Sequence, residues 1–165
     1  MARPAWVLVA ILCACAPLRG PGMTPSGLRL SELAGEGDAE RRTSLELVLQ
    51  GLDEDASGRP TAALAEYQSA LRVDPTNPWV YLALARHHVD GTQPERALPF
   101  LDQARALVEG QGVDSPRVEA HLLGLRGAAL VAIGRPVEGL PLLDEARTLA
   151  PDVWADGHLS ARELQ

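Results

Sequence analysis

Proline recurs in this sequence at a spacing that indicates a repeated structural unit. Pro60, Pro94 and Pro136 lie 34 and then 42 residues apart. The first and last of them stand in two matching segments, Gly58-Arg59-Pro60 and Gly134-Arg135-Pro136. In each segment the Gly is suited to close one helix and the Pro to open the next. We therefore expect an array of similar units, each containing a pair of helices.

Small and apolar residues follow the same two steps along the chain. Eight residues inserted between the second and third units account for the longer step. Agreement at several separate positions makes the repeat specific, although no single position would do so. The matching sets are Gly51, Ala85 and Gly127; Ala63, Ala97 and Gly139; Leu64, Leu98 and Leu140; Tyr67, Leu101 and Leu143; and Ala70, Ala104 and Ala146.

The pattern resembles the tetratricopeptide repeat, a helix-turn-helix unit of about 34 residues with small residues where its helices touch and Pro near its end. The resemblance implies an all-α fold, a right-handed solenoid of three helical hairpins with a C-terminal capping helix. Val153 and Trp154 are expected to cover the exposed end of the stack. The units span residues 44–77, 78–111 and 120–153, with an insertion at 112–119 and the cap at 154–165.

Capping residues support a set of expected helix boundaries. Thr43 with Glu46 forms a capping box, and Asn77 and Ser115 each precede a Pro that opens a helix. Helices are expected near residues 44–57, 60–73, 78–90, 94–108, 116–133 and 136–149.

The first residues have the layout of a secretory signal peptide, because Arg3 precedes an apolar run that ends in small residues. The run is shorter than the roughly 20 apolar residues that a membrane-spanning helix needs. Leu12-Cys13-Ala14-Cys15 resembles the bacterial lipobox. This implies that residues 1–15 are a signal peptide and that Cys15 is the lipidated residue. Ordinary cleavage after Ala16, or a helix of a cytosolic protein, are the alternatives.

The lipobox resemblance implies a lipoprotein of the bacterial cell envelope. Ala16 follows the anchor in place of an Asp. The resemblance implies that this favours passage to the outer membrane, with the protein facing the periplasm. A periplasmic or secreted location is the alternative. Residues 16–43 carry many Pro and Gly and no sustained period, so we expect a flexible tether between the anchor and the repeats.

Charge and residue types argue against nucleic-acid binding and catalysis. All 15 basic residues are Arg, against 22 acidic residues and a net charge of -7, whereas a phosphate-binding surface needs the opposite balance. His87, His88 and Asp90 do not predict a metal site, because neighbours on a helix point about 100 degrees apart. His88 is expected to pack between helices. No nucleophile with a base and no phosphate loop is evident, so we predict no catalytic residue, cofactor, metal or small-molecule substrate.

The resemblance implies that the chain binds a protein or peptide partner. In the family, the first helices of the units line a concave face that holds a partner segment. Arg86 is expected at its centre, where it would receive a carboxylate or carbonyl of that segment. The alternative is that these residues pack against one another or against the tether. The candidate groove residues are Leu45, Val48, Leu52, Trp79, Leu82, Arg86, Val89, His121 and Val131.

The function expected from these features is that of a membrane-anchored adaptor or scaffold. Two alternatives are an assembly or pilotin-like factor for an envelope secretion or pilus machine, and a secreted soluble repeat module without an anchor. All three predict protein binding by helical repeats and no enzyme activity.

Overall fold

The computed structural model describes residues 28–165, so the predicted signal peptide and Cys15 lie outside the described residues. Helix is the only regular secondary structure in the described part. In chain order the elements are η1 (Leu30–Leu33), α1 (Ala39–Ala56), α2 (Pro60–Val73), α3 (Pro78–Asp90), η2 (Pro94–Arg96), α4 (Ala97–Gly110), α5 (Pro116–Ala132), α6 (Pro136–Leu149), α7 (Pro151–Trp154) and α8 (Ala161–Leu164).

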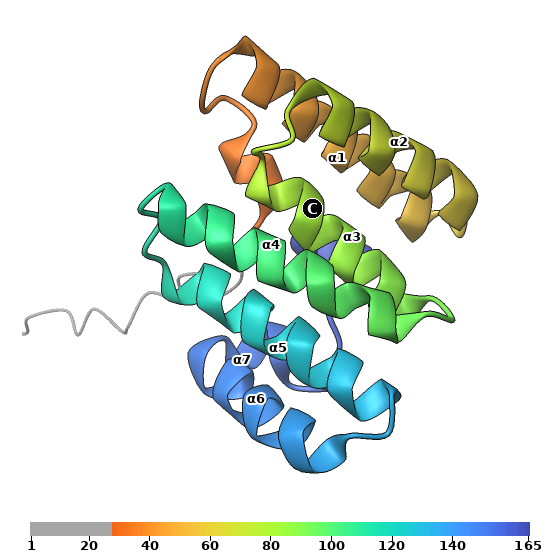
Figure 1. Cartoon of the computed structure of the whole chain (residues 1–165), viewed down its shortest axis with the longest axis vertical. Coiled ribbons are helices and arrows are strands. Elements are labelled where there is room, and N and C mark those ends of the chain that lie inside the picture. Colours follow the sequence, from red (N-terminus) through yellow and green to blue (C-terminus); the bar gives the residue numbers. More distant parts are fainter. Residues whose placement is uncertain (1–27) are drawn as a thin grey trace, which may run out of the picture.

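Six long helices form three hairpins that are stacked one on another (Figure 1). The pairs are α1 with α2, α3 with α4, and α5 with α6, and each helix packs most extensively on its hairpin partner. The first helices, α1, α3 and α5, also pack on one another in that order. The predicted all-α solenoid of three helical hairpins is confirmed.

The recurring small residues lie where the helices of a hairpin cross. A Cβ atom on Gly51 of α1 would lie 2.3 Å from the Tyr67 ring of α2. In the third hairpin, a Cβ atom on Gly127 would lie 2.8 Å from the backbone oxygen of Gly139. Such distances leave no room for a side chain, so these glycines set how closely the helices approach.

The helices that Pro opens have nearly the predicted boundaries. Those of α2, α3 and α6 agree with the prediction, and Asn77 caps α3 by accepting a hydrogen bond from the Trp79 N–H at 3.1 Å. Gly58 and Gly134 have φ of 71° and 82°, the left-handed conformation expected after a helix end. Ser115 differs from the prediction, because its side chain makes no capping hydrogen bond.

The start of α1 corrects two predictions. The helix begins five residues earlier than expected, and the side chain that caps it is Asp38, which accepts from the Arg41 N–H at 2.8 Å. Thr43 therefore lies inside the helix and bonds the Ala39 carbonyl. Arg41 explains the longer helix, since its guanidinium reaches Asp74 and the Thr76 carbonyl in the loop before α3.

The predicted flexible tether, residues 16–43, is wrong for its described part. Residues 28–43 are packed onto the repeats: Leu30 is fully buried, Leu28 is 7% exposed, and η1 follows directly. The pattern of Pro and Gly favoured a tether because it carries no helical period. Three leucines are nevertheless enough to hold such a segment when an apolar face lies beside it.

The C-terminal cap consists of two single turns in place of one helix. α7 continues directly from α6, and Trp154 at its end is fully buried, as expected. The chain then turns at Gly157, where φ is 78°, and runs back to place α8 against α1 at the other end of the stack. The C-terminus consequently lies level with α3 (Figure 1).

Candidate functional site

The first helices bring most of the predicted groove residues together on one face. Seven of these nine side chains are buried, with 8% exposure or less. The five apolar ones belong to one apolar cluster shared by all three hairpins, and the other two, Arg86 and His121, are buried polar side chains. The seven are Leu45, Val48 and Leu52 of α1, Trp79, Leu82 and Arg86 of α3, and His121 of α5.

The remaining two predicted groove residues differ from this set. Val89 is half-buried and packs at the edge of the cluster. Val131, at the end of α5, is 36% exposed and lies beside Gly139 of α6. Val131 therefore faces its own hairpin partner, and the predicted groove does not extend to it.

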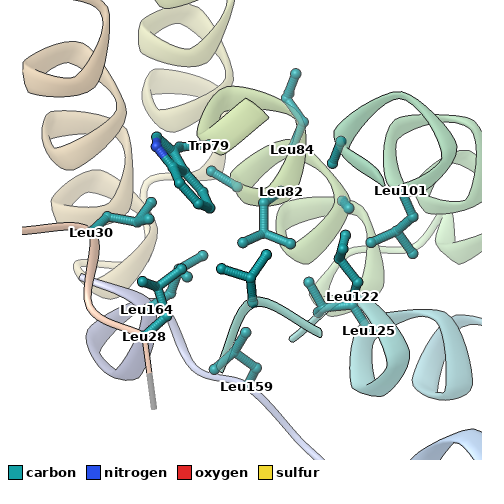
Figure 2. Packing of buried hydrophobic residues seen from close by; sticks show 14 of the residues in the cluster. Leu28, Leu30, Trp79, Leu82, Leu84, Leu101, Leu122, Leu125, Leu159 and Leu164 are labelled. Carbon is teal, nitrogen blue, oxygen red and sulfur yellow. The ribbon is translucent and has the colours of Figure 1, made fainter. Parts of the chain in front are cut away.

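Two segments that flank the hairpins cover this face: residues 28–33 before α1 and residues 155–165 after α7, referred to below as the two ends. Leu28 and Leu30 approach it from the N-terminal side, and Leu159 and Leu164 from the C-terminal side, as Figure 2 shows around Trp79 and Leu82. Each of these four leucines is 7% exposed or less. The two ends also bond each other, because the Ser31 N–H donates to the Gln165 carbonyl at 2.8 Å.

The groove is therefore not open to a partner while the two ends are in place. Of the two sequence-based interpretations, packing of these residues within the chain agrees with the structure. Displacing the ends would expose several buried leucines, each worth roughly 1.5–3 kcal/mol.

His121 is the polar group at which the two ends and α5 meet. Its Nδ1 accepts a hydrogen bond from the Trp154 indole N–H at 3.3 Å. An indole nitrogen can only donate, so the ring proton is on Nε2, which donates to the Leu28 carbonyl at 3.2 Å. Burial lowers the pKa of His121 to about 4, against a smaller opposing effect of the Leu28 hydrogen bond. The ring is neutral in this arrangement.

Arg86 occupies a polar network at the other end of the face. Its guanidinium bonds the carboxylates of Asp55 in α1 and Asp90 in α3. Asp55 also accepts from the Tyr67 hydroxyl at 2.9 Å, and His87 Nδ1 lies 2.9 Å from it. Arg86 was expected to receive a carboxylate or carbonyl of a partner, and in the structure both carboxylates that it bonds belong to its own chain.

The electrostatics of this network are balanced internally. Burial alone would raise the pKa of the Asp55 carboxyl, but the hydrogen bond from His87 and the charge of Arg86 outweigh it and hold the pKa below its ordinary value. Asp90 also accepts from His158 Nε2 at 2.9 Å, which ties the C-terminal segment to α3. His158 was not predicted from the sequence, since it lies in the loop before α8 and belongs to no periodic pattern.

The histidine pair shows no sign of binding a metal. His88 is 9% exposed and stacks on Phe100, with ring centroids 5.4 Å apart, so it packs between helices as predicted. Within residues 28–165 no group of His, Cys, Asp or Glu side chains has the arrangement of a metal site. Within the same residues, no helix is long and apolar enough to cross a membrane.

Two open grooves lie outside the covered face. One, of about 340 Å³, is bordered by Leu64 and Leu71 of α2 and by Phe100 of α4. The larger, of about 630 Å³, lies between α4, the loop after it, α5 and the end of α6. The sequence analysis identified neither of them.

Stacked hairpins with small residues at the crossings define a helical-repeat protein of the tetratricopeptide class. Residues 56–120 match the family model described as tetratricopeptide repeat. The matched residues, from the end of α1 to the first part of α5, are therefore of the tetratricopeptide repeat type. Repeats of that family act as protein–protein interaction modules. Comparisons with curated proteins and with solved structures gave no match.

Proposed function

We propose that the protein is an adaptor of the bacterial cell envelope, in which a lipid on Cys15 holds the chain at a membrane and the helical repeats hold a protein partner. The observation that carries the proposal is the three-hairpin stack with its match to the tetratricopeptide repeat. The segment Leu12-Cys13-Ala14-Cys15 supports the anchor. Anchoring through several acyl chains would be durable.

The partner is proposed to bind a surface that the chain's own ends leave open. The concave face is filled by apolar side chains of residues 28–30 and 159–164. A partner that used this face would have to replace buried leucines at a cost of several kcal/mol. The grooves between the outer helices need no such rearrangement.

The anchor is tested by Cys15→Ser in cells that express the full chain. We expect the variant to leave the membrane fraction and to lose the acyl mass, because the thiol that accepts the lipid is gone. Cys13→Ser is the matched control, and it should remain in the membrane fraction. A Cys15→Ser protein that still pellets with membranes and carries the same acyl mass contradicts the anchor.

The adaptor role is tested by crosslinking in living cells followed by mass spectrometry. A partner protein that is captured by the full chain, and lost when the three hairpins are unfolded by a core substitution, supports the role. Failure to capture any protein reproducibly, with the chain folded and abundant, contradicts it. A chain found only in the medium would instead favour the secreted module.

A further inference from the structure

The eight inserted residues have a definite place in the fold. The repeat step of 34 residues predicts that α4, the equivalent of α2, ends at residue 107, but α4 continues to Gly110. The step of 42 residues predicts that α5, the equivalent of α3, begins at residue 120, but α5 begins at Pro116. The loop between them, residues 111–115, is one residue longer than the loop at 74–77. The insertion thus adds three residues to α4, one to the loop and four to α5.

The lengthened helices line a groove on the outer surface. Nine of its thirteen lining residues lie within 108–119, and the groove measures about 630 Å³. It ends against Glu145 and Leu149 in the last part of α6, which has no such extension. The groove therefore exists because of the insertion, and the α2–α3 junction, which lacks the insertion, has no counterpart to these added turns.

The floor of the groove is apolar and held in place by backbone hydrogen bonds. Gly112 has φ of 67° and closes α4, so that the Val113 N–H donates to the Val108 carbonyl at 3.0 Å. This motif typically brings the side chain after the Gly against the last turn of the helix. Val118 and Leu122 of α5 complete the floor and are 3% and 2% exposed.

The rim of the groove is acidic. Arg105 is its one cation, and Glu119 holds it with two hydrogen bonds of 2.9 and 3.0 Å. The hydrogen bond to Glu119 is the main reason why the pKa of Arg105 is raised. Glu109 lies 3.9 Å from the same guanidinium and is 68% exposed. Asp114 and Glu145 are exposed and have no cationic partner among residues 28–165. Four carboxylates against one Arg leave the groove with a net charge of -3.

We propose that this groove binds a protein segment in which apolar side chains are flanked by Lys or Arg. The inference rests on the proposed adaptor function and names the surface and the chemistry of the partner. Val108, Val113 and Leu149 would receive the apolar side chains. The flanking cations would be received by Asp114 and Glu145, and by the exposed Glu109, which Arg105 approaches only at 3.9 Å. An acidic or phosphate-bearing ligand is disfavoured by the same charges.

The test measures binding of a defined peptide to the full-length purified protein. The probe is a fluorescent peptide in which Leu and Phe alternate with pairs of Lys or Arg, and its control replaces each cation with Glu. We expect a dissociation constant of roughly micromolar size for the basic peptide and no binding of the acidic one. Binding should weaken as salt is added, because the carboxylates are exposed.

Charge reversal on the rim provides the decisive comparison. The double variant Glu109→Arg with Glu145→Arg should bind the basic peptide at least about tenfold more weakly. The matched control, Glu46→Arg with Glu66→Arg, changes the net charge equally on α1 and α2 and should bind like the wild type. Val113→Ser should weaken binding about fivefold through loss of apolar area. Circular dichroism and melting curves establish that each variant is folded.

Two results would overturn the inference. One is a basic peptide that does not bind the wild type, and the other is equal binding by the rim double variant and its control. The crosslinking experiment separates this failure from failure of the proposed function. If the rim double variant still captures the cellular partner, the adaptor role stands and the groove assignment is wrong.

Discussion

Arg86 places a full positive charge inside the stack, with only 2% of its surface exposed. Two carboxylates from different helices compensate that charge, since Asp55 comes from α1 and Asp90 from α3. One donor of the guanidinium, Nε, is buried without a hydrogen-bond partner among the described residues. A buried ion pair of this kind is stable only when both partners are present. A buried guanidinium or carboxylate that lost its partner would carry a large desolvation cost.

The variant Arg86→Met tests this dependence. The substitution keeps the length of the side chain but leaves the half-buried Asp55, and Asp90, without their cation. We therefore expect a loss of roughly 3–5 kcal/mol in the free energy of unfolding. Arg59→Ala is the matched control, because its pair with Glu54 is exposed and screened by water, so its loss should change stability little. Urea unfolding followed by circular dichroism measures both. Equal losses in the two variants would contradict the structural role of Arg86.

From the sequence, Arg86 was expected at the centre of the concave face, where it would receive a carboxylate or carbonyl of a partner. In the structure it is 2% exposed and bonds Asp55 of α1 and Asp90 of α3. Pairing Arg86 with Asp55 requires the relative height of α1 and α3, and a repeat pattern contains no information on that height. The same holds for His121, whose partners Leu28 and Trp154 lie 93 and 33 residues away.

Among the elements, those that Pro opens were predictable and those at the two ends were not. A fixed φ and a missing N–H make Pro a local signal, so the starts of α2, α3, α5 and α6 needed no tertiary information. η1 and α8 each have a single turn and owe their position to burial against the hairpins and to each other. Segments this short are not stable alone, so local patterns could not predict their packing.

Leu164→Ala tests whether α8 belongs to the folded core. Leu164 is fully buried beside Leu28, so the substitution should lower the free energy of unfolding by about 2–5 kcal/mol. Val137→Ala, on the surface of α6 with 87% exposure, should change it by less than about 0.5 kcal/mol. Thermal unfolding monitored by circular dichroism gives the comparison. If Leu164→Ala melts like Val137→Ala, α8 is only loosely attached and the concave face is accessible to partners.

On the scale of the whole molecule, the chain closes its three-hairpin stack with its own ends. A solenoid leaves an apolar face along its first helices and apolar surface at its terminal repeats. Here the N-terminal segment and the C-terminal segment meet over that face and join α1 to α5. The outer surface, where the inserted residues line a groove, remains open, and the proposed partner is assigned to it for that reason. His121 stands at the junction of these parts, so its protonation should be coupled to the stability of the whole fold.

The pH dependence of stability follows from the depressed pKa of His121. In the unfolded chain the imidazole titrates at its ordinary pKa of about 6.5, and in the folded chain at about 4. The unfolded state therefore binds more protons between these values, and stability falls as the pH is lowered through this window. The stability that the neutral imidazole contributes is fully present above pH 6.5 or so. By pH 4 this residue lowers the free energy of unfolding by about 3 kcal/mol.

The variant His121→Gln isolates this contribution. Its amide can accept from Trp154 and donate to Leu28 without titrating, so the variant should lose about 3 kcal/mol less than the wild type between pH 7 and pH 4. His88 also has a pKa lowered by burial, which adds a smaller slope that both proteins share. Urea unfolding at a series of pH values measures both proteins. Parallel curves for the wild type and His121→Gln would show that the imidazole is not buried at the junction, and that the two ends of the chain do not close the concave face in solution.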